Sequence, residues 1–224
     1  MCGRYTITIH ADSARDDLGI VSMPDDYYPR YNVAPTQPVA VVTDPVQRAA
    51  GWMRWGLIPF WAKDPSIASR LINARSETVM EKPAFKNAFL KRRCLILADG
   101  FYEWQKGSGP KGRSQPFYFK RADEKAFAFA GLWEFWRSPE GPEIRSCTIL
   151  TCDANDLVRP VHPRMPVILS GDDLWAWLSS ERKPGELQDM LQPYPAELMV
   201  TYPVSPQVNR PELDSPDLVR PLAA

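Results

Sequence analysis

The chain has 224 residues, of which 44% are hydrophobic and 24% are charged, and its 27 basic residues balance its 27 acidic ones. This composition is typical of a soluble globular protein, and no apolar run approaches the roughly 18–20 residues that a membrane span needs. The first residues show no basic-then-apolar export signal, and the four cysteines lack the paired C-x-x-C spacing of a structural zinc site. We therefore expect a cytoplasmic protein with free thiols, no membrane partner and no metal.

Taken in chain order, the sequence predicts many short elements, because 23 prolines interrupt both helices and central strands. Helices are predicted at residues 13–18, 82–93, 172–178 and 185–191. Strands are predicted at residues 39–43, 94–98, 116–121, 126–134, 145–151 and 199–202. This order favours a single α+β domain over residues 1–224, with a mainly antiparallel, barrel-like sheet and peripheral short helices.

Two segments are predicted to lie outside these elements. The glycine-rich residues 107–112 read as a flexible hairpin connection rather than a domain linker. Residues 206–224, rich in proline and charge, read as a tail that packs on the surface of the domain and gives no indication of function.

The charge is distributed unevenly along the chain. Residues 53–121 contain fourteen basic residues and five acidic ones, so this third carries about +9 and the remainder about −9. A segregated positive region on a neutral protein is typical of a face that binds a polyanion such as nucleic acid. The alternative is an ordinary solvated surface whose basic residues point in several directions.

Cys2 is the first candidate for chemistry. Once Met1 is removed, which is efficient before a small residue, Cys2 carries a thiol and a free α-amine on one two-carbon unit. With pKa values of about 8 and 8.5, a useful fraction of each is nucleophilic at neutral pH. Such a pair condenses with an aldehyde to a Schiff base, and the thiol then closes a thiazolidine ring. The alternatives are the nucleophile of an amidase or self-processing peptidase, and an incidental cysteine at a frayed terminus.

Two further residues suit proton transfer. His162 lies in a loop stiffened by Pro160, Pro163 and Pro166, and histidine titrates closest to neutral pH; the other histidine, His10, is expected at the surface. Glu103 lies among aromatic residues at the end of an apolar strand, where partial burial would raise its pKa. The alternatives are a loop histidine bonded to backbone and an outward-facing glutamate.

Asn73 and Arg75 alternate, so both are expected on one side of an extended segment, where an amide and a guanidinium suit a sugar hydroxyl and a phosphate. The eight tryptophans include four in or beside the basic region: Trp52, Trp55, Trp61 and Trp104. Aromatic rings among arginines and lysines are typical of single-strand binding, where bases stack and phosphates pair. We expect most of the eight rings in the core and two or three on nucleic acid.

Seven segments, taken together and in order, resemble the SOS-response-associated peptidase (SRAP) family. They are MCGR at 1–4, RYNVAPT at 30–36, WGLIP at 55–59, INARSET at 72–78, CLILADGFYEW at 94–104, HPRMP at 162–166, and YPVS at 202–205 followed by Val208 and Asn209. Several are weak alone, but the ordered set spans nearly the whole chain and is specific.

The resemblance implies a barrel-like core with a basic cleft for single-stranded DNA, and a protein that shields abasic sites in the DNA-damage or SOS response. Cys2 would bond to the ring-opened aldehyde of an abasic site and form a thiazolidine crosslink. Asn73 would hold the crosslink, Glu103 would orient the α-amine and the sugar or shuttle protons, and His162 would assist Schiff-base formation and ring opening. The resemblance also implies thiol autopeptidase and strand-cleaving lyase activities, no organic cofactor and a monomer.

The resemblance implies a set of residues in contact with DNA: Arg4, Asn32, Pro35, Trp55, Trp61, Arg75, Ser76, Trp104 and Arg164. In this set Arg4, Arg75 and Arg164 would meet phosphates. The chain departs from the family pattern at one position, because Pro163 follows His162 where many relatives have Asp. If that Asp orients the histidine in relatives, the pKa of His162 and its protonation step would differ in this chain. The alternatives to the crosslinker are a thiol peptidase that uses the same Cys2 and a non-covalent reader of DNA.

Overall fold

The computed structural model describes residues 2–107, 112, 114–138 and 141–222. Its strands are β1 Tyr5–Ile7, β2 Arg30–Val33, β3 Pro38–Val42, β4 Ala50–Trp55, β5 Asn73–Arg75, β6 Arg93–Ala98, β7 Gly100–Gln105, β8 Gln115–Arg121, β9 Phe127–Arg137, β10 Glu143–Asp153, β11 Arg164–Pro166, β12 Ile168–Leu169 and β13 Met199–Pro203. The hairpin connection predicted at residues 107–112 falls between β7 and β8 and lies almost entirely outside the described residues.

Five strands close into a barrel. In the order β10, β4, β3, β6 and β9, each strand pairs with the next, and β9 pairs back onto β10. Four of these five pairings are antiparallel, and only β10 runs parallel to β4. Closure leaves no free edge among the five strands. The predicted α+β fold with a mainly antiparallel, barrel-like core is confirmed.

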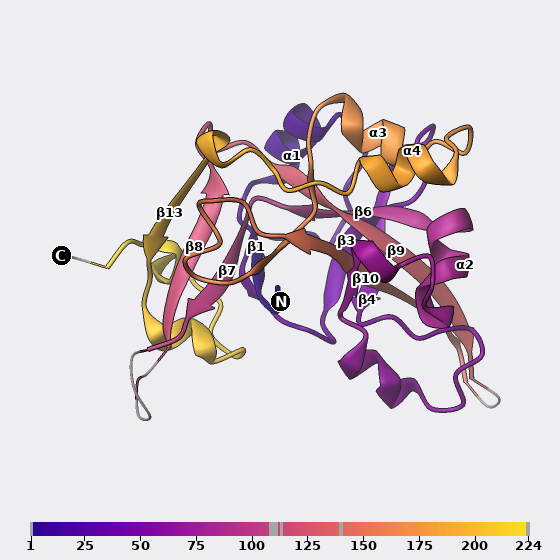
Figure 1. The fold of residues 1–224 in the computed structure, drawn as a ribbon, viewed down its shortest axis with the longest axis horizontal. Helices are drawn as coiled ribbons and strands as arrows, with labels where there is room; N and C mark the ends of the chain where they lie inside the picture. The colour runs from indigo at the N-terminus through magenta and orange to yellow at the C-terminus, as the bar shows by residue number, and fades with distance from the viewer. Residues whose placement is uncertain (1, 108–111, 113, 139–140, 223–224) are drawn as a thin grey trace.

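A second sheet stands beside the barrel, in the order β13, β8, β7, β1 and β2, and all its pairings are antiparallel. Figure 1 shows β1 on the side of this sheet that faces the barrel, with β8 and β13 on the outer side. The chain passes directly from β6 of the barrel to β7 of the second sheet through the single residue Asp99. The strand that follows residues 2–4 therefore runs along the junction of the two sheets.

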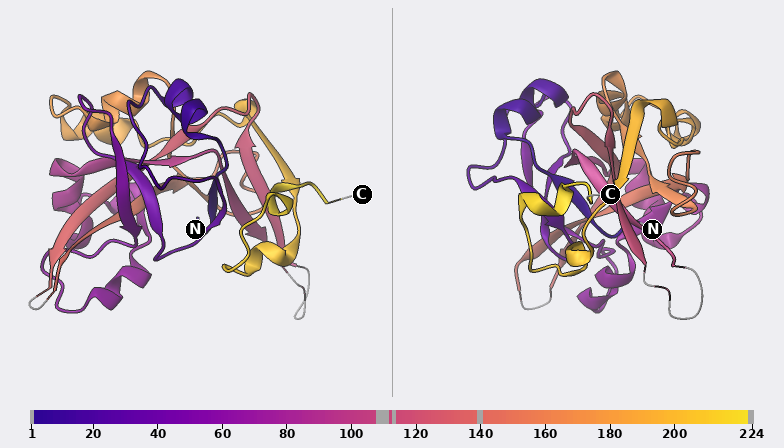
Figure 2. Two further views of the ribbon diagram at one scale, coloured as in Figure 1. Left: turned by 180° about the vertical axis from the view of Figure 1, so that it is seen from behind. Right: turned by 90° about the vertical axis from the view of Figure 1, so that its left-hand side faces the viewer.

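The helices are short and peripheral, as predicted: α1 Ala11–Leu18, α2 Pro83–Lys91, α3 Asp172–Leu178 and α4 Pro184–Asp189, with 3-10 turns η1 Pro65–Arg70, η2 Ser76–Thr78, η3 Ala196–Leu198, η4 Pro206–Asn209 and η5 Pro216–Val219. Pro83 takes the first turn of α2, where its missing N–H costs no hydrogen bond. Helices α1, α3 and α4 gather at one end of the molecule, and the C-terminal segment (yellow) lies against the second sheet (Figures 1 and 2).

The C-terminal segment completes a second, smaller core. Val208 and Leu218 are buried with Tyr102 and Tyr118 of the second sheet. The C-terminal segment therefore packs against the second sheet. Within the described residues no helix is both long enough and apolar enough to cross a membrane, and no three His, Cys, Asp or Glu side chains form a group suited to a metal ion.

The close approach of β7 to β8 yields a stability prediction at Gly100. A Cβ on Gly100 would lie 2.1 Å from the hydroxyl oxygen of Tyr118, which is itself buried. Because this part of the second sheet is close-packed, we expect Gly100→Ala to lower the free energy of unfolding by about 1–3 kcal/mol. Urea denaturation followed by circular dichroism measures this change.

Gly51→Ala is the matched control. It makes the same substitution in another strand, β4, where an added Cβ meets nothing within 4 Å. We expect a change below about 1 kcal/mol in either direction. Equal effects at the two glycines would contradict the steric explanation.

Candidate functional site

Cys2 is fully buried, with 0% of its surface exposed. Two neighbours fix its main chain. The side-chain amide of Asn73 donates to the Cys2 carbonyl oxygen at 2.8 Å, and two residues along, the Arg4 carbonyl accepts from the Tyr102 backbone N–H at 3.0 Å. The Cys2 thiol lies 3.8 Å from that same Arg4 carbonyl, within the range of a weak S–H···O bond.

The carboxylate of Asp99 holds the strand that follows Cys2. It accepts from the hydroxyl groups of Thr6 and Thr8, both at 2.6 Å, and from the backbone N–H groups of Thr8 at 2.5 Å and Ile9 at 3.1 Å. Burial raises the pKa of Asp99, and these four hydrogen bonds oppose the rise by stabilising the charged form. The sequence analysis assigned no role to Asp99, although its place between a buried strand and a glycine was visible.

Glu103 lies on β7 with only 2% of its surface exposed. Burial raises its pKa to about 7 because a carboxylate loses hydration in an apolar setting. The predicted burial and raised pKa are confirmed. A carboxyl group that titrates near neutral pH can both accept and return a proton under physiological conditions.

The thiol of Cys2 is less acidic than the sequence analysis assumed. Burial raises its pKa well above the ordinary range, and the negative charge of Glu103 raises it further. The interaction with Glu103 also places the two residues close together. The expectation that a useful fraction of this thiol is ionised at neutral pH is wrong for the buried residue, and any reaction at this sulfur needs a group that takes its proton.

Asn73 and Arg75 occupy the two ends of β5, which runs parallel to β10. Both line one pocket of about 560 Å³, so the prediction that they face the same side is confirmed. The other lining residues combine basic and apolar side chains: Trp61, Arg70, Leu71, Thr78, Lys82, Pro83, Ala84 and Phe85. The sequence analysis did not single out Arg70 or Lys82, whose places in the pocket follow from the path of the chain between β4 and α2.

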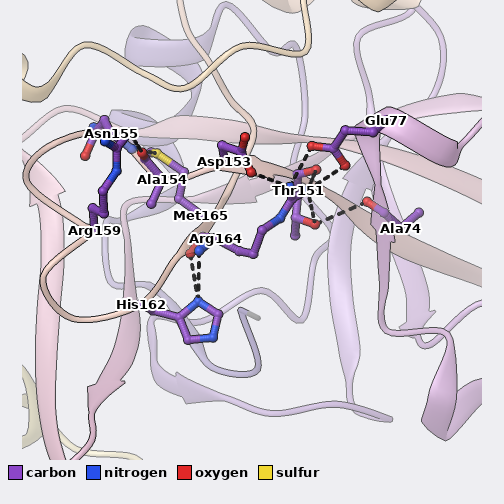
Figure 3. Close-up of polar contacts among 10 residues, drawn as sticks. All are labelled: Ala74, Glu77, Thr151, Asp153, Ala154, Asn155, Arg159, His162, Arg164 and Met165. Carbon is purple, nitrogen blue, oxygen red and sulfur yellow. Dashed lines mark hydrogen bonds and ion pairs between the residues drawn. The ribbon is translucent and has the colours of Figure 1, made fainter.

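His162 lines a second pocket of about 610 Å³ together with Trp104, Lys106 and Gln115. Burial lowers its pKa below the ordinary value for histidine, which favours a neutral imidazole at neutral pH. Its Nδ1 lies 3.1 Å from the backbone nitrogen and 3.0 Å from the carbonyl oxygen of Arg164 (Figure 3). The main chain of Arg164 therefore orients the ring, and no side chain at position 163 is needed for this.

Cys2 interacts with one residue of the first pocket and with a chain neighbour of a residue of the second. Asn73, which binds its carbonyl, lines the first pocket. Glu103, whose charge acts on its thiol, is the chain neighbour of Trp104 in the second pocket. Cys2, Asn73 and Glu103 thus lie close together. His162 lines the second pocket, which also contains Trp104, the residue after Glu103 in the chain.

The nine residues predicted to contact DNA fall into distinct environments. Arg75 is exposed, as is Trp61 at 49%. Arg4, Pro35 and Trp104 are half-buried. These five have surface that a strand can reach, and their contacts with DNA remain predictions.

Trp55 and Asn32 are 0% exposed, so in the free chain neither residue presents surface to a DNA strand. The Trp55 ring packs edge-on against Tyr5 in the core, and its indole N–H donates to the Ile72 carbonyl at 2.9 Å. Ser76 is 5% exposed and is also removed from a bound strand. These three side chains present little or no surface to a strand in the free chain, and their contacts with DNA also remain predictions.

Asn32 connects the C-terminal segment to Arg4. Its side-chain oxygen accepts from Arg4 Nη1 at 3.0 Å, and its Nδ2 donates to the carbonyls of Arg210 at 2.9 Å and Leu213 at 2.7 Å. In the same segment, the side chain of Asn209 accepts from the Trp104 indole N–H at 2.7 Å. The segment therefore supports two residues of the candidate site, a role that its sequence did not indicate.

Comparisons with known proteins agree with this geometry. A family model described as SOS response associated peptidase (SRAP) matches residues 1–211. The chain is 43% identical over 223 residues to the abasic site processing protein YoqW of Bacillus subtilis, covering 98% of this chain and 99% of that protein. It is 35% identical to the abasic site processing protein HMCES of Gallus gallus, covering 99% of this chain and 78% of that protein.

A solved structure extends the comparison to three dimensions. The crystal structure of a protein from Bacteroides thetaiotaomicron superposes with a TM-score of 0.88 at 26% sequence identity, covering 99% of this chain and 100% of that one. The barrel, the second sheet and their junction therefore form an arrangement that a solved protein shares.

The buried carboxyl of Glu103 predicts a pH-dependent stability. Its pKa of about 7 in the folded state lies above the ordinary value of 4.5, so between these values the folded chain binds a proton that the unfolded chain has released. Stability therefore falls as pH rises through this window. We expect Glu103→Gln, which cannot ionise, to be about 1–3 kcal/mol more stable than the unchanged chain at pH 8.

Denaturation at pH 4.5, 6 and 8 measures this effect. At pH 4.5 the two chains should differ little, because Glu103 is protonated there in the folded state and the comparison serves as an internal control. Parallel pH profiles for Glu103→Gln and the unchanged chain would refute the assignment.

Proposed function

The chain belongs to the SOS-response-associated peptidase (SRAP) family, and we propose that it processes abasic sites in DNA by forming a thiazolidine crosslink between Cys2 and the ring-opened sugar. The observation that carries this proposal is the position of Cys2. It is held by Asn73, which lines a pocket with basic and aromatic side chains, and it lies beside a carboxyl group with a pKa of about 7. The relatives described above carry names that refer to abasic site processing.

The first step is Schiff-base formation, and it requires the α-amine that removal of Met1 exposes on Cys2. The amine nitrogen attacks the aldehyde carbon of the opened sugar, a C–N bond forms, and water leaves as the C=N bond is made. The Glu103 carboxylate takes a proton from the attacking nitrogen and returns it to the departing hydroxyl. A carboxyl group that titrates near neutral pH suits both transfers.

The second step closes the ring. The Cys2 sulfur attacks the imine carbon, an S–C bond forms, and the C=N electron pair becomes a lone pair on nitrogen, which takes up the proton that the thiol releases. Because burial and Glu103 raise the pKa of this thiol, its proton has to leave as the sulfur attacks. The order of events follows, with the amine reacting first and the thiol trapping the imine.

His162 supports ring opening of the sugar. A neutral imidazole, favoured by the lowered pKa, can take the proton of the sugar hydroxyl as the ring opens to the aldehyde. The imidazole lines the pocket that contains Trp104, on the side of Cys2 where Glu103 lies. The same Schiff base also permits β-elimination of the 3′ phosphate, and strand-cleaving lyase activity is part of the proposal.

The DNA strand follows the two pockets across Cys2, and the protein acts as a monomer. Arg75, Arg70 and Lys82 supply positive charge for phosphates, while Trp61 and Trp104 offer ring surface on which unpaired bases stack. Single-stranded DNA suits these hollows because its bases are free to stack. A thiol peptidase that uses the same Cys2 is the second candidate, on the ground that the description of the matching family model names a peptidase.

The crosslink gives the most direct test. Purified protein lacking Met1, mixed with a single-stranded oligonucleotide that carries one abasic site, should give a heat-stable shifted band on a denaturing gel. Cys2→Ala should abolish the band, and Cys152→Ala, which removes another buried thiol, should retain it. An oligonucleotide with a tetrahydrofuran analogue, which has no aldehyde, should give no band.

Cys2→Ser separates the candidates. A hydroxyl in place of the thiol prevents thiazolidine closure, whereas a hydrolase retains a usable nucleophile. Absence of a band from the unchanged chain, once mass spectrometry has shown that Met1 is missing, would overturn the proposed function.

Arg75 gives a test of strand binding that is independent of the covalent step. In a Cys2→Ala background, Arg75→Glu should weaken binding of single-stranded DNA by about tenfold, or about 1.4 kcal/mol, and should reduce the salt dependence of binding. Fluorescence anisotropy over a range of salt concentrations measures both. Arg15→Glu on α1, an equal charge reversal at an exposed position away from the pockets, is the control and should leave affinity within about twofold of the parent.

A further inference from the structure

Arg164 was predicted to bind a phosphate, but its guanidinium already has two carboxylate partners. Its Nη1 donates to Glu77 Oε1 at 2.6 Å and to Asp153 Oδ1 at 2.8 Å. Its Nη2 donates to Glu77 Oε2 at 3.0 Å and to the Thr151 carbonyl at 2.7 Å. The side chain is 15% exposed. Figure 3 shows the guanidinium enclosed by these partners, with the His162 ring at the other end of the residue.

Charge balance disfavours a phosphate at this position. One guanidinium and two carboxylates carry a net charge of −1, which repels an anion. A phosphate would also have to displace short charge-assisted hydrogen bonds, among them the paired bonds to Glu77. The side chain of Arg164 is therefore occupied by the protein itself.

The main chain of Arg164 holds the imidazole of His162 in either protonation state. When the ring is neutral, Nδ1 accepts from the Arg164 N–H at 3.1 Å, which leaves the ring proton on Nε2. When the ring is protonated, Nδ1–H can donate to the Arg164 carbonyl at 3.0 Å. A histidine that gives and takes a proton during a reaction needs such a partner, because its orientation is then kept through both states.

The loop around His162 is fixed on both sides of the ring. The His162 N–H donates to the Val158 carbonyl at 3.0 Å, and the Pro163 carbonyl accepts from the Ala154 N–H at 3.0 Å. Arg164 itself begins β11 and pairs with Asp153 of β10. Pro163 has no N–H to offer, and the pattern of bonds around it requires none.

Glu77 connects this loop to the Asn73 segment. It lies in η2, directly after β5, whose first residue binds the Cys2 carbonyl. The ion pair with Arg164 therefore joins the segment that holds Cys2 to the loop that presents His162. Asp153 adds a fixed point on the barrel strand β10.

We propose that Arg164 is a positioning residue, whose guanidinium is anchored by Glu77 and Asp153 so that its main chain aims the imidazole of His162 into the site. This inference rests on the proposed function for the reaction that the imidazole serves. It assigns to Arg164 and its two carboxylates the orienting task that an Asp after the histidine would otherwise be expected to perform.

Glu77→Gln gives opposite results under the two roles. If Arg164 positions His162, the variant loosens the anchor, and we expect the crosslinking rate at saturating abasic DNA to fall about fivefold or more, with affinity in the Cys2→Ala background within twofold. If Arg164 binds phosphate, the same change frees the guanidinium, so affinity rises and the rate is kept. Glu81→Gln, which removes the same charge from an exposed residue four positions along, is the matched control and should match the unchanged chain in both measurements.

Arg164→Lys provides the complementary variant. Lysine keeps the charge but lacks the planar fork that engages two carboxylates, so a positioning role predicts a loss of rate with little loss of affinity. A loss of affinity above fivefold with an unchanged rate at saturation would overturn the inference, as would an unchanged rate in Glu77→Gln.

A spectroscopic measurement separates this inference from the proposed function. The chain has two histidines, so NMR can follow the titration of His162 with the exposed His10 as an internal reference and His10→Gln for assignment. Lys106 and Arg164 are the charged side chains whose fields act on this imidazole. We expect the pKa of His162 to lie below the ordinary value for histidine and to rise toward that value in Glu77→Gln and Arg164→Lys, with no shift in Glu81→Gln.

Each failure has its own signature. An unchanged His162 titration in both variants, in protein that the spectra show to be folded, would overturn the inference whether or not crosslinks form. A shifted titration in a chain that forms no crosslink would support the positioning role and would count against the proposed function instead.

Discussion

The relation between the barrel and the second sheet depends on one buried carboxylate. Asp99 is the single residue between β6 and β7, and it accepts four hydrogen bonds from residues 6–9. A buried charge is tolerated only when hydrogen bonds replace its lost hydration, so Asp99 requires these N-terminal residues as much as they require Asp99. The strand that follows Cys2 is thereby fixed at the junction of the two sheets, and the nucleophile is placed by a contact that takes no part in the chemistry.

The site combines a buried nucleophile with a buried acid. Burial raises the pKa of both Cys2 and Glu103, and the charge of Glu103 further disfavours the thiolate. A cysteine hydrolase works by the opposite arrangement, in which a neighbouring positive charge lowers the pKa of the thiol. A protonated thiol beside a carboxyl group that titrates near neutral pH suits a reaction in two steps. In such a reaction the α-amine first attacks the aldehyde, and the sulfur then attacks the resulting imine. This arrangement supports the proposed capture of an aldehyde over the alternative of peptide hydrolysis.

Local patterns in the sequence predicted four of the five barrel strands, all but β4, and all four helices, because apolar periodicity and proline placement act over short distances. Motif order predicted the family, and Asn73, Cys2 and Glu103 do lie together. The patterns did not reveal short strands such as β1 and β5, which depend on partners far along the chain. Nor did they show that Trp55 and Asn32 are buried or that Arg164 has carboxylate partners, since an arginine in a motif looks the same whether Glu77 or a phosphate faces it.

The long separation between β1 and its partner β7 has a consequence for biosynthesis. Tyr5 pairs with Val33 of β2 on one side and with Phe101 of β7 on the other, so the N-terminal strand is enclosed between both partners only after about a hundred residues have been made. The side chain of Cys2 is buried in the folded chain. We therefore expect Met1 to be removed most readily from the nascent chain, in the interval before β7 is made.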